Sequence, residues 1–579
     1  MAIADKQLLV RGIAMIDTFL DGKETISDCW RSIAERAPNK EAVVHYVAGE
    51  EPYRWTWGEI LRVSSLYARA LRDRGIRKGD ICAIIIRHHK DFYPIYMGIS
   101  LLGALPAVLA YPNSRLHPDK FRQGLEGMVK RSGLDYILTE KELGSVVNPM
   151  VTGSGSTIRA VLYPLEWSLE GEAVEDFPST KRGGDAPCLL QHSSGTTGLQ
   201  KAVVLTHRSV LEHMRRYGKV IGIREDDKVV SWLPLYHDMG LIAAFYLPLT
   251  LGIPLVQLDP FEWVSAPVIL LEAISSEKGT LAWLPNFAYN LMADRIREDD
   301  LDGIRLESLR MLINCSEPVR AESHEKFLSR YAPFGLRKKA LAACYAMAET
   351  TFAATQTLPG KDARHISVAR EDLSAGVIRP VGPGEYGKVC VSSGAPISGC
   401  ELRVLDDGGN ALPENRVGEI AIRSVSLFNG YHNNPEKTDE VLKDGWYFSG
   451  DYGFLNAGEY FIIGRKKDII ILAGKNIYPE DIEDVVGQVD GVLPGRVVAF
   501  GVADDSTGTE QICVVAESKA DDEAEKKKLR MEIIQAGMGI DVTISMVYLP
   551  PPRWLIKSSS GKPARKANMG RTIAELKAY

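Results

Sequence analysis

Helix-like and strand-like hydrophobic patterns alternate along the chain through residue 350. Thr56, with Glu59 three residues later, forms a capping box, and Gly75 ends the helix that this pattern predicts. One face of the helix is apolar at Ile60, Val63, Tyr67 and Leu71. The apolar run at 81–86 then predicts a buried strand. Repeated alternation of this kind predicts an α/β fold with helices layered on mostly parallel sheets.

The uncharged run from Phe92 to Tyr111 has the length of a membrane span. Pro94 and Pro106 interrupt it, and the preceding residues are strongly polar. Proline suits the first turn of a helix but breaks a helix interior. We therefore expect a buried helix followed by a buried strand at 107–110, and no membrane span.

Length and composition narrow the class of protein. A chain of 579 residues exceeds the size of one hydrophobic core, so at least two domains are expected. The net charge of -6 lacks the basic surplus typical of nucleic-acid binders. Eight cysteines form no CxxC pair or Cys/His cluster, and charged residues near the start interrupt any signal-peptide core. Reduced thiols in a cytoplasmic protein are expected.

Two short apolar runs, at 188–190 and 202–205, flank a loop of small and hydroxylated residues. This pattern predicts a strand, a tight loop and a second strand. Glycines let backbone N–H groups approach a phosphate, hydroxyls donate to its oxygens, and lysine adds a positive charge. A surface loop without function would have the same composition, and the spacing is not that of a Walker loop. The candidate phosphate-binding residues are Ser193, Ser194, Gly195, Thr196, Thr197, Gly198 and Lys201.

The loop sequence SSGTTGLQK, at 193–201, resembles the phosphate loop of the adenylate-forming superfamily. That superfamily includes acyl-CoA ligases and fatty acyl-AMP ligases. SWLPLYHDMGL at 231–241 and WLPNFAYNLM at 283–292 are most similar to the fatty acyl-AMP ligase branch. Further similar segments follow in the family order: NCSEPVR at 314–320, CYAMAETT at 344–351, WYFSGD at 446–451, GRKKDIIILAGKNIYPEDIE at 464–483 and LIKSSSGKPARK at 555–566.

The resemblance implies a role for each site residue. It assigns catalysis to Lys562, His237 and Glu349, and contacts with ATP or AMP to Ser316, Glu317, Tyr345, Asp451 and Arg465. Tyr345 offers a ring on which adenine can stack, and Glu349 offers a hard oxygen ligand to Mg²⁺. Lys562 would neutralise the substrate carboxylate and the α-phosphate together.

The same resemblance predicts two domains, with a boundary near Lys467. Residues 1–466 would form a large domain that binds the adenylate and the acyl group, and residues 467–579 a small mobile α+β domain. The apolar run after Lys467 predicts a strand, and Pro479 opens a helix. Rotation about Lys467 would bring the face around Gly474 to the acyl-adenylate for attack by a thiol.

About forty residues separate Glu349 from SSGAPISG at 392–399, more than in typical acyl-CoA ligases. An insertion here resembles the fatty acyl-AMP ligase branch, where it is thought to hinder the domain rotation that CoA transfer needs. Alternatively, the extra residues form a surface insertion without function, which the fold tolerates because loop insertions cost little free energy. Ala348, in place of the more usual threonine, also resembles that branch.

The function implied is an acid–thiol ligase that joins an apolar carboxylic acid to a thiol through an acyl-adenylate. We expect CoA as the acceptor, with phosphopantetheine on an acyl carrier protein as the alternative. Gln200 and Ala202 replace the proline and glycine usual in this loop, so the thioester-forming half-reaction is predicted to dominate. The alternative from another functional class is a nucleotide-binding scaffold without catalytic activity.

Overall fold

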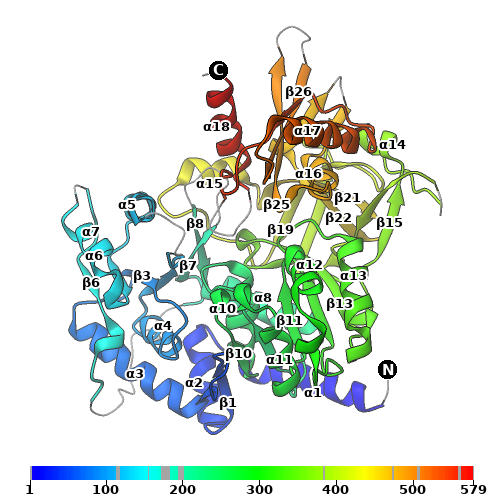
Figure 1. The fold of residues 1–579 in the computed structure, drawn as a ribbon. Helices are drawn as coiled ribbons and strands as arrows, with labels where there is room; N and C mark the ends of the chain where they lie inside the picture. Colours follow the sequence, from blue (N-terminus) through cyan, green and yellow to red (C-terminus); the bar gives the residue numbers. More distant parts are fainter. Residues whose placement is uncertain are drawn as a thin grey trace.

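The computed structural model describes residues 3–112, 118–153, 155–170, 183–193, 201–382, 385–472, 475–504, 509–557 and 563–577. Figure 1 shows the first two-thirds of the chain packed into a broad α/β body, with the C-terminal strands and α17 standing on one side of it. The expected α/β architecture with mostly parallel sheets is confirmed for the two sheets at the centre of this body.

The largest sheet has nine strands in the order β17-β14-β13-β12-β11-β9-β10-β1-β2. Its six central strands, from β13 to β1, run parallel. The antiparallel pairs are β2 with β1 at one end of the sheet, and β14 with β13 and with β17 at the other. The strands are β1 (Glu41–His45), β2 (Tyr53–Thr56), β9 (Val229–Ser231), β10 (Leu255–Gln257), β11 (Leu281–Leu284), β12 (Met311–Asn314), β13 (Leu341–Ala346), β14 (Ala353–Gln356) and β17 (Ala395–Pro396).

A second, fully parallel sheet has the order β4-β3-β5-β6. Its strands are β3 (Ile81–Ile85), β4 (Leu105–Val108), β5 (Tyr136–Thr139) and β6 (Ala160–Leu162). The strand expected at 107–110 therefore begins two residues earlier and includes Pro106. This is tolerated because β4 is an edge strand, where proline's missing N–H breaks no inner ladder.

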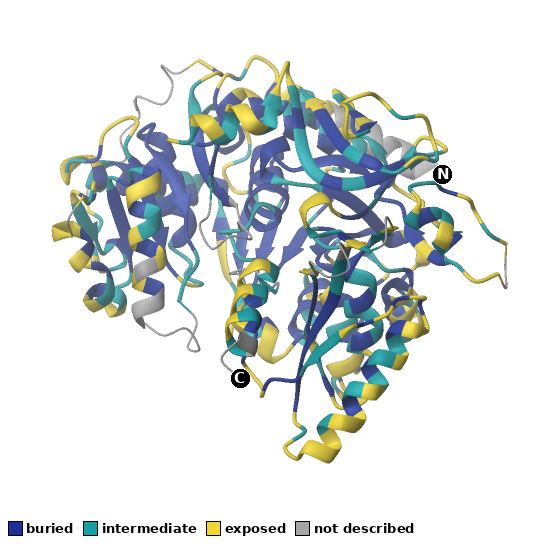
Figure 2. Ribbon diagram, turned by 90° about the horizontal axis from the view of Figure 1, so that it is seen from above, coloured by how far each residue is buried: buried dark blue, intermediate teal, exposed yellow. Residues whose placement is uncertain are grey.

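Helices cover both parallel sheets, and Figure 2 shows their outer faces exposed while the strands are largely buried. The predicted helix is α3 (Trp57–Asp73), whose capping box between Thr56 and Glu59 forms as expected. Gly98 of α4 lets α3 approach closely, because a Cβ there would lie 2.9 Å from the Ser64 carbonyl oxygen. The other helices up to the phosphate-loop hairpin are α1 (Ile3–Leu20), α2 (Ile26–Arg36), α4 (Phe92–Leu101), α5 (Pro118–Ser132), α6 (Gly144–Val147) and α7 (Pro149–Thr152).

The run weighed as a membrane span forms α4 and β4, both buried in the body. Over the described residues, no helix has both the length and the apolar character needed to cross a bilayer. Further along the chain lie α8 (His207–Val220), α9 (Leu247–Leu251), α10 (Pro260–Ser265), α11 (Val268–Glu277), α12 (Asn286–Arg295) and α13 (Ala321–Tyr331).

Antiparallel strands dominate after residue 350. A five-stranded sheet comprises β18 (Cys400–Leu405), β19 (Gly418–Ser424), β20 (Leu442–Lys443), β21 (Trp446–Asn456) and β22 (Glu459–Arg465), with α15 (Pro435–Val441) leading into β20. The segment expected to be an insertion forms β15 (His365–Val368), α14 (Arg370–Ser374) and β16 (Lys388–Val391). The two strands of this segment pair with each other.

The chain beyond residue 467 has its own sheets and an apolar cluster of its own. The predicted strand and helix are present as β23 (Ile470–Leu472) and α16 (Pro479–Gly487), which has proline in its first turn. The remaining elements are β24 (Lys475–Ile477), β25 (Val492–Asp504), β26 (Thr509–Ser518), α17 (Glu523–Met538), β27 (Met546–Tyr548) and α18 (Arg565–Lys577). The mobility of this part and a boundary at residue 467 stay predictions.

Candidate active site

The predicted phosphate loop joins two strands of a hairpin, β7 (Pro187–Ser193) and β8 (Lys201–Thr206), whose antiparallel ladder ends at the pair Ser193 and Lys201. The strand–loop–strand prediction is therefore confirmed. Ser194, Gly195, Thr196, Thr197 and Gly198, together with Gln200, lie outside the described residues, as does the side chain of Ser193. Lys201 is described, so the hairpin can be followed into the site through β8.

Lys201 and Glu349 meet at one tyrosine. The Lys201 Nζ lies 4.6 Å from the centre of the Tyr431 ring, and the Tyr431 hydroxyl donates to Glu349 Oε1 over 2.7 Å. Burial lowers the pKa of Lys201, while the neighbouring Glu349 carboxylate acts in the opposite direction. Glu349 is only 8% exposed. These contacts hold a cation and an anion beside each other without a direct ion pair.

Glu349 fits the role of a metal ligand. It is a buried carboxylate, and among the described residues no Lys, Arg or His lies within ion-pairing distance of it. The described part of the chain has no group of three metal-binding side chains. Mg²⁺ commonly takes one or two protein carboxylates and completes its shell with phosphate oxygens and water. A single buried carboxylate beside a phosphate loop matches that requirement.

Asp451, Tyr345 and Arg465 form a second polar group. The Tyr345 hydroxyl donates to Asp451 Oδ2 over 2.6 Å, and Arg465 Nε lies 3.3 Å from Asp451 Oδ1. Asp451 and Arg465 face each other as a register pair of β21 and β22. Burial, followed by the Asp451 charge, raises the pKa of Tyr345 well above its ordinary value. The residues predicted to hold adenine and ribose therefore lie together.

Lys467, the predicted hinge residue, lies in the same electrostatic environment. Burial lowers the pKa of its ammonium group, and the charges of Arg465 and Lys201 lower it further. The Asp468 and Asp451 carboxylates act in the opposite direction. The position of Lys467 is compatible with the predicted hinge, since it lies in the short 3₁₀ turn, Lys466–Asp468, that follows β22.

The segment at 314–320, which resembles the family turn whose backbone brackets adenine and is called the adenine turn here, connects three elements. Ser316 has a left-handed backbone with φ 69°, and its hydroxyl lies 3.8 Å from Met239 Sδ. Glu317 Oε2 accepts a hydrogen bond of 2.9 Å from the Phe287 backbone N–H at the start of α12. Left-handed backbone at a residue other than glycine is strained and is found preferentially at functional sites. The turn therefore touches both segments that are most similar to the fatty acyl-AMP ligase branch, at Met239 and at Phe287.

His237 stands at the entry to a π-helix, Met239–Tyr246, that continues into α9. Its Nδ1 lies 2.7 Å from Asp238 Oδ1, and its backbone N–H donates to the Pro234 carbonyl over 3.1 Å. π-Helical turns are rare and are often found at functional sites. The backbone turn therefore fixes His237 where the apolar helix begins.

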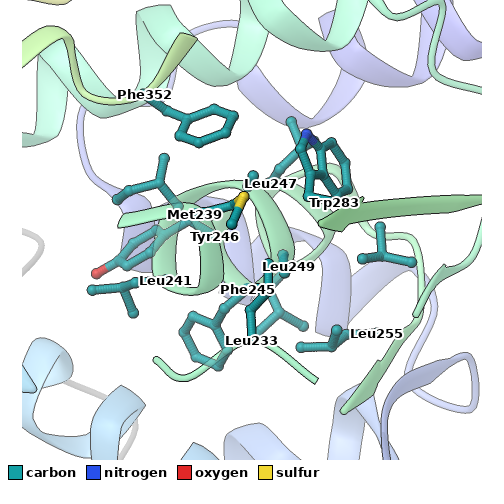
Figure 3. Close-up of a cluster of buried hydrophobic side chains, with 14 of the residues drawn as sticks. Leu233, Met239, Leu241, Phe245, Tyr246, Leu247, Leu249, Leu255, Trp283 and Phe352 are labelled. Atoms are coloured by element: carbon teal, nitrogen blue, oxygen red, sulfur yellow. The ribbon is translucent and has the colours of Figure 1, made fainter. Parts of the chain in front are cut away.

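Buried apolar side chains surround this π-helix. Figure 3 shows Met239, Leu241 and Tyr246 around the helix, with Trp283 and Phe352 above it. All of these side chains are buried. The region next to His237 and Ser316 is thus apolar and buried.

The last predicted motif is anchored on both sides of its undescribed centre. Lys562 lies outside the described residues, as does Gly474. Lys557 and Pro563 form a β-bridge across that centre. Burial lowers the pKa of Lys557 to about 8, and Glu317 of the adenine turn is among the charges that act on it. Lys557, at the start of this motif, therefore experiences the charge of Glu317 in that turn.

Arg565 ties this segment to the rest of the C-terminal part. Its guanidinium lies 2.7 Å from Asp468 Oδ2, 2.7 Å from Glu483 Oε1 and 3.4 Å from Glu480 Oε1. Its Nε donates to the Ala499 carbonyl over 2.8 Å. Burial raises the pKa of Glu483 to about 7 although Arg565 opposes the shift. One arginine thus links the Lys562 segment, the residue after the predicted hinge and α16.

Helix α16 also contacts residues far earlier in the chain through opposite charges. Arg320, the last residue of the adenine turn, forms an ion pair with Asp484 and donates to the Glu480 carbonyl over 3.3 Å. Lys388 of the expected insertion lies 2.6 Å from Asp481. The Tyr386 hydroxyl donates to the Gly539 carbonyl over 2.7 Å. The insertion therefore contacts the C-terminal part directly.

The structure changes one argument about the phosphate loop. Ala202 lies in β8, where it pairs with His192 and packs into an apolar cluster. Its backbone is not left-handed, so no conformation reserved for glycine is required at this position. An alanine fits this backbone without strain, and the effect of its Cβ on the loop stays a prediction.

Three site residues escaped the sequence reasoning: Tyr431, Tyr447 and Arg320. The Glu349 charge acts on both tyrosines, and Tyr447 also experiences Asp451 and Tyr345. Their roles depend on strands that pair far apart in sequence, such as the bridge from Val203 to Tyr431. Tyr447 and Arg320 lie within the similar segments at 446–451 and 314–320, and a glycine before Tyr431 indicated a turn there.

The site brings together a lysine at the start of β8, a buried glutamate and an aspartate–arginine pair, which is the set of charged groups that the resemblance predicts for an enzyme that forms adenylates. The profile of the AMP-binding enzyme family matches residues 30–432. The chain belongs to this family of acyl-adenylate-forming ligases, and within the adenylate-forming superfamily to the fatty acyl-AMP ligase branch.

Several relatives match over nearly the whole chain. A putative ligase of Mycobacterium tuberculosis, Rv1013, is 31% identical over 543 residues, covering 91% of this chain and 97% of that protein. The probable long-chain-fatty-acid–AMP ligase FadD30 of the same organism is 29% identical over 573 residues, covering 93% and 96%. A structure from a study of fatty acyl-adenylate ligases of E. coli and L. pneumophila superposes with a TM-score of 0.89 at 26% identity, covering 97% of this chain and 100% of that one.

Proposed function

We propose that this protein activates a fatty acid or another apolar acid as acyl-AMP and passes the acyl group to the phosphopantetheine thiol of a carrier protein. A carboxylate oxygen attacks the α-phosphorus of ATP, and pyrophosphate leaves. The observation that carries the proposal is the convergence of Lys201, Glu349 and the Asp451–Arg465 pair on one site.

The chemistry requires positive charge and a dry acyl pocket. Two anions meet in the first step, so cations placed in advance stabilise the developing charge on phosphate oxygens. Lys201 and Arg465 occupy that position, and Asp451 is placed to accept ribose hydroxyls. Mg²⁺, when bound at Glu349, would neutralise phosphate oxygens. The buried π-helix beside His237 provides the apolar surface for the acyl chain.

Two observations support a carrier protein in place of the expected CoA. Relatives that align over nearly the full chain are named as fatty-acid–AMP ligases. In addition, the segment from β15 to β16 binds the C-terminal part through Lys388 and Tyr386. A rotation about Lys467 would have to break these contacts. Breaking them costs free energy, so the rotation is disfavoured and acyl-AMP would stay on the enzyme or leave it before transfer.

The proposal is tested by separating the half-reactions. The protein is incubated with ATP, Mg²⁺ and a panel of fatty, aryl and polycyclic acids, and acyl-AMP is measured by mass spectrometry. Synthetic acyl-AMP is then offered with CoA or with a phosphopantetheinylated carrier. Formation of acyl-AMP with transfer to the carrier supports the proposal. Transfer to CoA alone would show that CoA, and not a carrier protein, is the acceptor. Nucleotide binding without either half-reaction would indicate a scaffold.

The prediction of weak adenylation has its own test. ATP–pyrophosphate exchange in the presence of free acid is compared with thioester formation from supplied acyl-AMP. If the loop departures impair adenylation, Gln200→Pro combined with Ala202→Gly raises exchange and leaves thioester formation unchanged. Robust exchange by the wild-type protein would contradict the prediction.

A further inference from the structure

Tyr431 connects two groups that the proposed reaction needs at different points. Its hydroxyl donates to Glu349 Oε1 over 2.7 Å, and the face of its ring lies 4.6 Å from Lys201 Nζ. The ring also packs edge-on to Phe428, with centroids 5.0 Å apart. Tyr431 itself is buried. A single side chain therefore touches the candidate metal ligand at one end and the phosphate-loop lysine at its face.

The backbone around Tyr431 explains why this placement is rigid. Tyr431 forms an isolated antiparallel β-bridge with Val203 of β8, and the His432 N–H donates to the Ala202 carbonyl over 2.8 Å. The Val204 N–H donates to the Gly430 carbonyl over 3.1 Å. The Tyr431 N–H donates to Thr438 Oγ1 over 2.9 Å. The phosphate-loop strand and Tyr431 therefore move as one unit.

A hydrogen bond to one carboxylate oxygen has a directional effect. Because Tyr431 occupies Oε1, the other oxygen of Glu349 is left to face a cation. Hydrogen bonds from outer residues commonly orient metal-binding carboxylates and change metal affinity by tenfold or more when removed. The ring under Lys201 restrains the ammonium group through a cation–π contact.

We propose that Tyr431 is a positioning residue that sets the Glu349 carboxylate for a divalent cation and couples it to Lys201 of the phosphate loop. This inference rests on the proposed function, because it assigns Glu349 a metal-binding role. Two substitutions separate the two contacts. Tyr431→Phe removes the hydroxyl and keeps the ring under Lys201, whereas Tyr431→Leu removes both.

The first measurement is cation binding rather than turnover. Mn²⁺ is titrated into the full-length protein with α,β-methylene-ATP, and free Mn²⁺ is followed by electron paramagnetic resonance. We expect Tyr431→Phe to weaken Mn²⁺ binding roughly tenfold. The matched control is Tyr460→Phe, which removes a buried hydroxyl that donates to the Leu402 carbonyl over 2.6 Å, and it should leave binding unchanged.

The second measurement compares the two half-reactions. Tyr431→Phe should raise the Mg²⁺ concentration needed for conversion of acyl-AMP and pyrophosphate to ATP, with the rate largely recovered at high Mg²⁺. Transfer of supplied acyl-AMP to a thiol should stay within twofold of wild type. Tyr431→Leu should in addition raise the KM for pyrophosphate, because Lys201 loses its restraint.

The outcomes distinguish this inference from the proposed function. Unchanged Mn²⁺ binding in Tyr431→Phe, or equal loss of both half-reactions, would overturn the positioning role while wild-type activity still supports the ligase. Absence of both half-reactions in the wild type would remove the proposed function itself. If Tyr431→Phe and Tyr460→Phe weaken Mn²⁺ binding equally, the effect is a general destabilisation of the fold, and the inference is overturned.

Discussion

Substitution of Arg565 by glutamine probes how the Lys562 segment is held. The guanidinium lies 2.7 Å from both Asp468 and Glu483, and its exposed fraction is 15%. Removing one partner from a buried ion pair costs about 3–5 kcal/mol, because the remaining charges stay buried without compensation. Glu483 can relieve part of this cost by binding a proton, so we expect a loss of about 3 kcal/mol at pH 8.

The effect should depend on pH with a defined sign. Burial raises the pKa of Glu483 to about 7, above its ordinary value of 4.5. A carboxyl whose pKa is raised on folding contributes stability that is complete below the unfolded value and is lost as the pH rises through the folded value. Without Arg565 this loss becomes larger. The variant should therefore be much closer to wild type at pH 5, where Glu483 is protonated in both.

Hydrogen exchange measured by mass spectrometry provides the assay, because it reports local opening without requiring the whole chain to unfold reversibly. At pH 8, peptides from α16 and α18 should open roughly a hundredfold more often in Arg565→Gln than in wild type. Arg530→Gln is the control, since Arg530 makes an exposed pair of 3.4 Å with Glu523 and should change opening little. Equal acceleration at pH 5 and pH 8 would refute the reasoning.

Three further predictions concern the site and its closure. Lys201→Met should lower ATP–pyrophosphate exchange by roughly a hundredfold and affect thioester formation from supplied acyl-AMP far less. Equal losses in the two assays would exclude a specific role of Lys201 in binding pyrophosphate. Burial lowers the pKa of Lys557 from 10.5 to about 8, so docking of its segment should strengthen as the pH rises through 8; limited proteolysis should show slower cleavage there at pH 9 than at pH 7. Lys388→Gln should speed transfer of the acyl group to the thiol, because it weakens the contact with Asp481. An unchanged single-turnover rate would show that this contact does not slow the transfer.

Local rules of the chain predicted much of the framework. The capping box at Thr56 and the apolar face after it specify α3, and the strand, loop and strand around the phosphate loop form as expected. Pro479 marks the start of α16. These features are readable because caps, prolines and apolar periodicity act over a few residues. The strand expected at 107–110 was misplaced by two residues, because tolerance of Pro106 depends on its edge position in the sheet.

Resemblance of motifs supplied the candidate residues, but their arrangement is a property of the tertiary structure. The sequence alone determined that hydroxyls, glycines, a lysine and two carboxylates of the right types are present. Only the folded chain decided that Tyr431 lies between Lys201 and Glu349, or that Arg320 meets α16. Those contacts join residues separated by more than eighty positions. Pairing at such distances is decided by sheet order and burial, which no local pattern encodes.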